Sequence, residues 1–300
     1  MSHASDEPRI MLIGVSGQVG SALMRVLPAL GSVEACDRSR LDLACADDIR
    51  RVVGECKPQI IVNAAAYTAV DRAESEHELA TAINVEAPRM LAEAAKKIGA
   101  LLVHYSTDYV FDGGKAEAYV ENDIPNPLSV YGRSKLDGEQ AIRAAGGAHL
   151  IFRTSWVYGN DGANFMKTML RLARERDYLS IVSDQTGAPT SSDAIALATV
   201  QCLAQYPRQG SALDGVYHMT CGGQTSWHGF ALAIFDEFLT EDERSRIKVE
   251  AIPSQAYPTP AQRPRNSVLS NAKLLARFGI ALPAWRDALR QVHASVVLRI

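Results

Sequence analysis

The chain has 300 residues, of which 47% are hydrophobic and 22% charged, and its formal net charge is -3. This length is enough for one large domain or for two unequal lobes with a full core, as in an ordinary soluble globular protein. Without a basic block, nucleic-acid binding has little electrostatic support, and no apolar run approaches the roughly 20 residues that span a bilayer.

The N-terminus and the cysteines both indicate a cytoplasmic protein. Residues 1–7 are polar and lack the apolar segment of a signal peptide, so we expect a short disordered tail there. The five cysteines form no C-x-x-C pair, and an odd count without a secretory signal fits reduced thiols. The seven histidines show no ligand spacing, so we expect no metal site.

Short apolar runs and amphipathic segments alternate through the first half of the chain. The expected strands are residues 9–14, 32–36, 59–63, 100–105 and 148–153. Between them we expect helices at 18–30, 47–56 and 74–98, and another that contains Tyr131. Alternation of this kind predicts right-handed crossovers and a doubly wound parallel sheet with helices on both faces.

Beyond residue 160 this alternation breaks down, and only the segments 193–205, 228–239 and 284–296 favour helices. We therefore expect an α/β fold with a smaller C-terminal lobe. The predicted division gives the sheet domain residues 8–160 with parts of 190–220, and the lobe residues 161–189 and 221–300.

A glycine-rich turn joins the first expected strand to the first helix. Gly14, Gly17 and Gly20 lie in this turn, with Gln18 and Val19 between the last two. Glycine lets a backbone approach a pyrophosphate closely, and a helix N-terminus offers free amide donors and a positive dipole end. The context of strand, turn and helix favours dinucleotide binding over a plain turn, although the spacing is G-x-x-G-x-x-G.

An acidic residue follows the second expected strand, where a dinucleotide would place its adenosine ribose. Asp37 could bind the ribose hydroxyls of NAD, while Arg38 and Arg40 could neutralise the 2′-phosphate of NADP. An exposed Asp-Arg turn explains the same residues. Asp42 and Leu43 are weaker candidates for contact with the adenine.

The third expected strand ends in small residues. Ala64, Ala65 and Ala66 would let a dinucleotide lie across the strand ends, and Thr68 adds a hydroxyl. Tight packing of a helix on the sheet would explain the alanines equally well.

Tyr131 and Lys135 are four residues apart and share one face of the expected helix. A lysine cation near a phenol favours the phenolate, so we expect Lys135 to lower the pKa of Tyr131. The pair could then exchange a proton with an alcohol or carbonyl. Thr107, at the end of the preceding strand, could hydrogen-bond the same carbonyl oxygen. Each motif is weak alone, but the ordered set of glycine loop, strand-end hydroxyl and Tyr-x-x-x-Lys is specific.

With these motifs the chain resembles the extended short-chain dehydrogenase/reductase superfamily, and within it the family of dTDP-4-dehydrorhamnose reductases. The resemblance continues through further segments, which are 62–71, 104–112, 130–135, 152–158, 184–190 and 256–267. It implies a Rossmann-like fold and reduction of the C4 ketone of dTDP-4-dehydro-β-L-rhamnose by NADPH, with NADH as the alternative.

The resemblance also implies roles for individual residues. Tyr131 would protonate the C4 oxyanion, Lys135 would hold the nicotinamide ribose, and Thr107 would bind the C4 oxygen. The residues it places near the nucleotide sugar are Thr68, Asp108, Trp156, Asn164 and Arg263 or Arg265. For Trp156 a place in the core is equally compatible with the sequence, and surface arginines in a Pro-rich loop are the plain alternative for the last two.

The chain departs from one property of the family. Some members form a magnesium-bridged dimer through glutamates, but here the first glutamate position is Ala22 and the second region offers only Asp193. Because magnesium requires hard oxygen ligands, we expect no structural magnesium and a monomer, with a weak homodimer as the alternative.

Two other functions fit parts of the sequence. A related nucleotide-sugar epimerase or dehydratase is one, but dehydratases of this superfamily carry Thr-Asp-Glu where this chain has Thr107, Asp108 and Tyr109. A non-catalytic NADP-binding regulatory subunit is the other, and the intact set of Thr107, Tyr131 and Lys135 argues against it.

Overall fold

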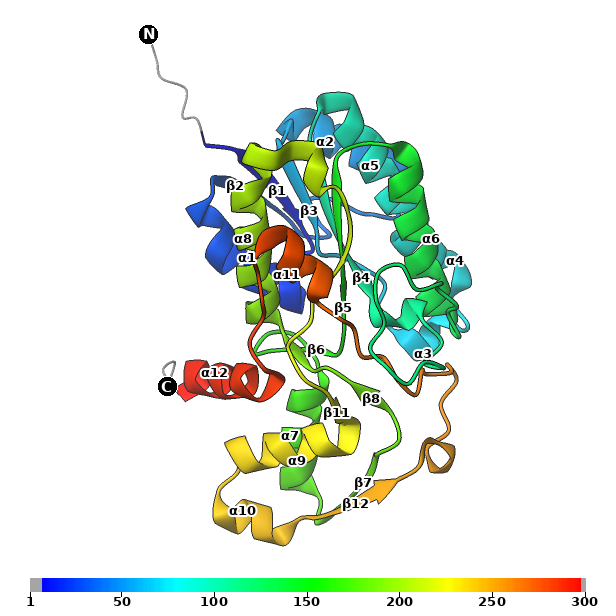
Figure 1. The fold of residues 1–300 in the computed structure, drawn as a ribbon, viewed down its shortest axis with the longest axis vertical. Helices are drawn as coiled ribbons and strands as arrows, with labels where there is room; N and C mark the ends of the chain where they lie inside the picture. The colour runs from blue at the N-terminus through cyan, green and yellow to red at the C-terminus, as the bar shows by residue number, and fades with distance from the viewer. Residues whose placement is uncertain (1–6, 298–300) are drawn as a thin grey trace.

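A computed structural model describes residues 7–297, so the disordered tail expected at 1–7 falls almost wholly outside the described part of the chain. Its centre is a sheet of six parallel strands in the order β10-β5-β4-β3-β1-β2 (Figure 1). The strands are β1 (Arg9–Ile13), β2 (Ser32–Cys36), β3 (Ile60–Asn63), β4 (Leu101–Thr107), β5 (His149–Thr154) and β10 (Gly215–His218). The predicted α/β fold with a parallel sheet is confirmed.

The strand order reverses beside β1. From β1 the chain passes to β2 on one side and then returns to β3 on the other side of β1. At such a switch point the loops leave the sheet in opposite directions and open a crevice beyond the carboxyl ends of the strands. The glycine turn follows β1 and the alanine run follows β3, so both border this crevice.

Alternate side chains of the strands build two cores, one on each face of the sheet. Ile10 and Leu12 pack with α1 (Gln18–Val26), α8 (Ser192–Gln209) and α11 (Ala272–Phe278), which cover one face. Met11 and Ile13 belong to the core of the opposite face. That face is covered by α2 (Ala46–Cys56), α5 (Ala87–Ile98) and α6 (Val130–Ala145). Strands buried on both faces explain the continuous apolar runs in the sequence.

A smaller lobe with its own core lies beyond the carboxyl ends of the sheet (Figure 1). Its helices are α7 (Phe165–Glu175), α9 (Trp227–Phe238), α10 (Glu241–Arg246) and α12 (Trp285–Val297). The parallel pair of β7 (Tyr178–Val182) and β12 (Lys248–Ile252) completes it. Two short pairs link the segments between lobe and sheet: β6 (Val157–Tyr158) with β9 (Thr190–Ser191), and β8 (Thr186–Gly187) with β11 (Thr225–Ser226).

The helix expected at 74–98 is interrupted. It begins later, as α4 (His77–Thr81), and passes through a wide π-helical turn at Ala82–Glu86 before it continues as α5. Pro88 has no N–H for the carbonyl of Asn84, so the helix widens there. That carbonyl instead faces α6, where a Cβ on Gly138 would lie 2.1 Å from it. The short helix α3 (Val70–Ala73) also precedes it.

In the described part of the chain, no helix combines the length and the apolar character needed to cross a membrane.

Candidate active site

The glycine turn is shaped by two close backbone contacts. Gly14 has a φ of +84°, and a Cβ there would lie 2.7 Å from the amide nitrogen of Ala65. A Cβ on Gly20 would lie 2.0 Å from the carbonyl oxygen of Gly14. No side chain caps α1 at Gly17, so the first amides of this helix can serve a ligand. The turn therefore forms a cradle that only glycines allow, at the positive end of a helix.

The charged residues that follow β2 differ in how far their side chains are already engaged with neighbours. One carboxylate oxygen of Asp37 accepts hydrogen bonds from the amides of Ser39 and Arg40 and from the Ser39 hydroxyl, which holds the pKa of Asp37 below its usual value. Arg40 pairs with Glu34 and Glu55. Arg38 is exposed and makes no ion pair with the described residues. Of the two arginines that the sequence left open, only Arg38 is uncommitted toward a 2′-phosphate.

Asp42 and Leu43 are engaged within the domain. Asp42 accepts a hydrogen bond from the amide of Ala44 at 3.0 Å, and Leu43 packs into the core under α2. Next to the crevice, Ala65 lies against Gly14, and Ala64 donates its amide to the carbonyl of Ile13. Ala66 is half-buried, and Thr68 is exposed.

Tyr131 lies in the first turn of α6, beside the end of β4. The Ser129 side chain caps this helix by accepting from the amide of Gly132 at 3.1 Å. Gly132 permits close approach to the 3-10 turn Asp108–Val110 that follows β4, because a Cβ there would lie 2.2 Å from the carbonyl oxygen of Tyr109. Burial raises the pKa of Tyr131 to about 12, and the hydroxyl of Thr107, which faces the phenol, opposes that rise. Tyr131 is therefore a neutral phenol at neutral pH.

Lys135 points away from this phenol, toward the sheet. Its Nζ atom donates to the carbonyl of Tyr105 at 2.7 Å and lies 3.0 Å from Nε2 of His104. Burial lowers the pKa of Lys135 to about 8. The expectation that Lys135 lowers the pKa of Tyr131 is wrong for the described structure, because the amine acts on His104 and Tyr105 and not on the phenol.

Asp108 lies behind Thr107. One carboxylate oxygen accepts from the Thr107 hydroxyl at 3.0 Å, and the other accepts from the Ser155 hydroxyl at 2.7 Å. Its side chain is 2% exposed, and this burial raises its pKa to about 6. Asp108 thus sets the direction of the Thr107 hydroxyl. Ser155 escaped sequence reasoning, although its place after β5, the neighbour of β4, could have identified it.

A cavity of about 890 Å³ lies along α7, β7 and residues 252–263 of the lobe, and Asp71 of α3 also lines it. Aromatic, amide and charged side chains from both parts of the chain line it, including Asp71, Phe165, Gln185, Trp227, Tyr257 and Arg263. Its polar groups beside apolar and aromatic walls are typical of a site for a substrate of mixed polarity.

Two of the expected substrate contacts are engaged with neighbours near this cavity. Arg263 donates to both carboxylate oxygens of Asp71, at 3.1 and 2.8 Å. Asn164 caps α7 by accepting from the amide of Lys167, and donates to Gln18 at 3.0 Å.

Trp156 supports a residue that lines the cavity, Trp227. Trp156 has a φ of +48°, a rare conformation for a bulky residue. Its ring stacks on Trp227, with ring centroids 3.5 Å apart. Trp227 donates its indole N–H to Gln185. The sequence analysis missed Trp227, because it is far from the motifs in the chain. Only its stacking on Trp156 identifies it. The strained Trp156 backbone is typical of a functional position.

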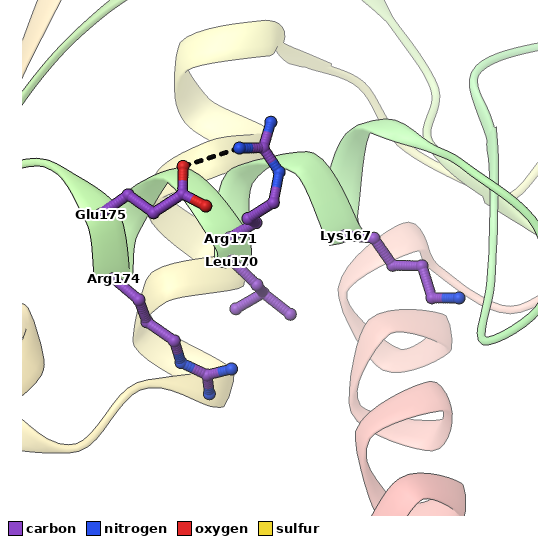
Figure 2. A pocket seen from close by; sticks show the side chains of 5 residues that line it. All are labelled: Lys167, Leu170, Arg171, Arg174 and Glu175. Carbon is purple, nitrogen blue, oxygen red and sulfur yellow. Dashed lines mark hydrogen bonds and ion pairs between the residues drawn. The ribbon is translucent and has the colours of Figure 1, made fainter.

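A second hollow, of about 440 Å³, lies on the outer face of α7 (Figure 2). Its lining side chains all come from that one helix, and Arg171 pairs there with Glu175 at 2.6 Å. None of the residues that the sequence singled out lies in it. The cavity beside Arg263 is therefore the better candidate for a substrate.

The residues at the family's magnesium positions are engaged differently. Ala22 is buried, and Asp193 pairs with Arg25 at 2.5 Å. Arg25 also pairs with Asp161 at 2.9 Å. In residues 7–297 no three side chains of the types that bind metals converge.

Comparison with known proteins decides the family. Residues 8–297 match the family model of the RmlD substrate binding domain. The chain belongs to the family of dTDP-4-dehydrorhamnose reductases. A relative of that name from Burkholderia thailandensis is 50% identical over 93% of this chain and 96% of its own length. Another from Escherichia coli K12 is 43% identical over 94% and 96%.

Solved structures agree with this membership. A dTDP-4-dehydrorhamnose reductase from Bacillus anthracis, in complex with NADP, superposes with a TM-score of 0.89 at 35% identity, over 96% of this chain and 99% of that one. A UDP-glucose 4-epimerase from Thermus thermophilus has a TM-score of 0.77 at 20% identity over 97% and 100%, a likeness that extends to the fold alone. The predicted membership of the family of dTDP-4-dehydrorhamnose reductases is confirmed.

Proposed function

We propose that this protein uses NADPH to reduce the C4 ketone of dTDP-4-dehydro-β-L-rhamnose, which yields dTDP-β-L-rhamnose in the last step of dTDP-L-rhamnose synthesis. One observation carries the proposal: Thr107 and Tyr131 meet at the end of β4, in the same sheet whose β1 leads into the glycine cradle. A ketone placed there would meet two hydroxyl groups at its oxygen.

The cofactor would lie along the crevice at the β1–β3 switch point. Gly14, Gly17 and Gly20, with the amides of Gln18 and Val19, would hold its pyrophosphate. The ribose and adenine would meet Asp37, Arg38, Asp42 and Leu43, and the strand-end residues Ala64, Ala65, Ala66 and Thr68 would border the rest. Arg38 forms no ion pair with the described residues and therefore favours NADPH, and the Bacillus anthracis relative was crystallised with NADP. The remaining oxygen of Asp37 leaves NADH as the alternative.

In this mechanism the bound cofactor supplies a hydride to C4 of the sugar. Tyr131 donates its phenolic proton to the oxygen on which negative charge develops. A phenol whose pKa is raised to about 12 is fully protonated at neutral pH, which is the state that a proton donor needs. In the described structure the Thr107 hydroxyl donates its single proton to Asp108, which Ser155 also holds, so it would turn from Asp108 to donate to the same oxygen. Lys135 would hold the nicotinamide ribose.

The lobe would bind the nucleotide sugar. Trp156 and Asn164 lie at its border with the sheet, and Arg263 lines the cavity. A guanidinium matches phosphate oxygens in geometry, so we assign Arg263 to the diphosphate, in competition with its present partner Asp71. We accordingly propose residues 8–160 with parts of 190–220 as the cofactor domain, and 161–189 with 221–300 as the substrate lobe.

The remaining proposals concern the protein's surroundings. Since Ala22 and the Arg25–Asp193 pair occupy the family's magnesium positions, we propose a monomer without structural magnesium. The five cysteines are all free thiols, in keeping with a cytoplasmic protein.

A coupled assay tests the function. The purified protein is mixed with NADPH and with dTDP-4-dehydrorhamnose made enzymatically from dTDP-glucose, and the NADPH absorbance is followed. We expect oxidation that depends on the sugar and gives dTDP-rhamnose. No oxidation with correctly made substrate would refute the reductase and leave a non-catalytic NADP-binding subunit. Turnover to an epimerised or dehydrated sugar without loss of NADPH would identify the other enzyme class.

A further inference from the structure

Three buried polar side chains lie in a row behind Tyr131, and the proposed reaction uses only the last of them. Asn63 ends β3, His104 faces it in register on β4, and Lys135 reaches His104 from α6. Nδ2 of Asn63 is 3.2 Å from Nδ1 of His104, and Nε2 of His104 is 3.0 Å from Nζ of Lys135. Each side chain is at most 1% exposed, so each contact must have one donor and one acceptor.

The direction of the first contact follows from a neighbouring amide. Ala65 donates its backbone N–H to Oδ1 of Asn63 at 3.2 Å, which leaves the Nδ2 group of Asn63 facing His104. The reverse orientation would set this N–H against the Asn63 NH₂ group and leave it without an acceptor. Because Nδ2 can only donate, Nδ1 of His104 must accept, and the imidazole proton lies on Nε2.

The direction of the second contact then follows. The Nε2–H group of His104 points at Nζ of Lys135, and an ammonium has no lone pair to accept it. A neutral amine accepts this hydrogen bond and still donates to the carbonyl of Tyr105 at 2.7 Å. We propose that Asn63 and His104 hold Lys135 as an uncharged amine in the cofactor-free protein at mildly alkaline pH, and that Lys135 takes up one proton from solvent when the cofactor binds.

The charges around the row permit this state. Burial is the main influence on Lys135 and lowers its pKa to about 8. Glu139, one turn along α6, favours the charged form, but it is bound by Arg153 at 2.7 Å and by Ser106. Burial lowers the pKa of His104 well below its usual value, so the imidazole stays neutral whether or not Lys135 is charged.

Binding of the dinucleotide, which rests on the proposed function, favours the charged form of Lys135 over the uncharged amine. Its phosphates add negative charge beyond the carboxyl ends of β1 and β3 and favour an ammonium nearby. The amine nitrogen of Lys135 binds a proton released by the buffer, with no other bond formed or broken. The ammonium then repels Nε2–H of His104 and is free to donate to the cofactor. His104 and Asn63 are therefore positioning residues for Lys135.

The proton uptake can be measured by calorimetry. NADPH is titrated into the full protein at pH 8.5 in two buffers with different ionisation enthalpies, and the difference in heat gives the protons exchanged. We expect uptake of more than half a proton per site. The Tyr131→Phe variant should show the same uptake, since a phenol with a pKa of about 12 stays protonated. Binding without uptake would overturn the inference, whereas the absence of any binding would overturn the proposed function itself.

Two variants and one NMR spectrum test whether the hydrogen bonds of Asn63 and His104, and not burial alone, keep Lys135 uncharged. In Asn63→Asp the carboxylate accepts from His104, moves the imidazole proton to Nδ1 and leaves Nε2 to accept from an ammonium, so uptake should fall close to zero. His218 is an equally buried histidine outside the site, and His218→Asn should keep the native uptake. Should Asn63→Asp fail to fold, ¹⁵N NMR of the free native protein decides. A His104 proton on Nε2 supports the inference, and a proton on Nδ1 overturns it.

Discussion

At the scale of single residues, the first prediction tests Tyr131 as the proposed proton donor. The phenol faces Thr107, and a positioned general acid contributes about 10²- to 10⁴-fold to the rate. Tyr131→Phe should therefore lower kcat by that factor, while the dissociation constant for NADPH changes less than about twofold. Stopped-flow turnover and fluorescence titration of NADPH would measure the two quantities. An unchanged kcat would exclude Tyr131 as the donor.

Asp108 makes a second prediction at this scale, about stability and pH. Burial raises its pKa from 3.8 in the unfolded chain to about 6, so the folded protein binds this proton more tightly. The free energy of unfolding attributable to this group is then highest below pH 4 and falls as the pH rises through 6. The difference of about two units corresponds to at most about 3 kcal/mol.

Asp108→Asn removes this dependence. Relative to the native protein, the variant should gain stability at pH 7.5, and the gain should shrink toward pH 4, since only the native carboxyl titrates between these values. Urea unfolding at both pH values measures the difference. A gain that grows toward acid pH would contradict the assigned direction.

At the scale of elements, the approach of α1 to the glycine turn depends on one missing Cβ. A methyl group on Gly20 would lie 2.0 Å from the carbonyl oxygen of Gly14, which is backbone and cannot yield cheaply. Gly20→Ala should therefore weaken NADPH binding at least tenfold and lower the melting temperature.

Gly54 provides the matched control. It lies within α2, and a Cβ there would meet nothing within 4 Å. Alanine favours a helix interior over glycine by about 0.5–1 kcal/mol, so Gly54→Ala should leave NADPH binding unchanged and stabilise the protein slightly. Equal losses of NADPH affinity in Gly20→Ala and Gly54→Ala would mean that the contact of residue 20 with the glycine turn does not cause the loss.

Elements also show where sequence reasoning succeeds. The strands of the sheet were predictable because burial on both faces leaves continuous apolar runs, and Tyr131, Lys135 and Thr107 because their spacing ties them to one helix and one strand end. The π-helical interruption at Ala82–Glu86 could not be predicted from the sequence. It arises because Pro88 has no N–H for the Asn84 carbonyl, which then faces α6. Trp227 and Ser155 join the site through contacts between distant segments, which no local pattern encodes.

At the scale of the whole molecule, the contacts of the Lys135 side chain with the sheet show what residue spacing leaves undetermined. A spacing of four residues places Tyr131 and Lys135 on one face of α6, but it leaves open which neighbour the long lysine side chain binds. His104 and the carbonyl of Tyr105 take it in the described structure. The sign of the Tyr131 pKa shift therefore depended on tertiary contacts that the spacing does not contain.

The last prediction concerns assembly. Arg25 lies one turn after Ala22 on α1 and binds Asp161 and Asp193, so its cation already neutralises the acidic groups that a shared magnesium ion would use. Light scattering should give a mass near the 32.5 kDa of one chain both in excess Mg²⁺ and in EDTA. Arg25→Ala frees both carboxylates but leaves Ala22 without ligand oxygens, and it should also remain a monomer in Mg²⁺. A native dimer that EDTA dissociates would contradict the proposal, because magnesium would then bridge chains without the family's glutamates.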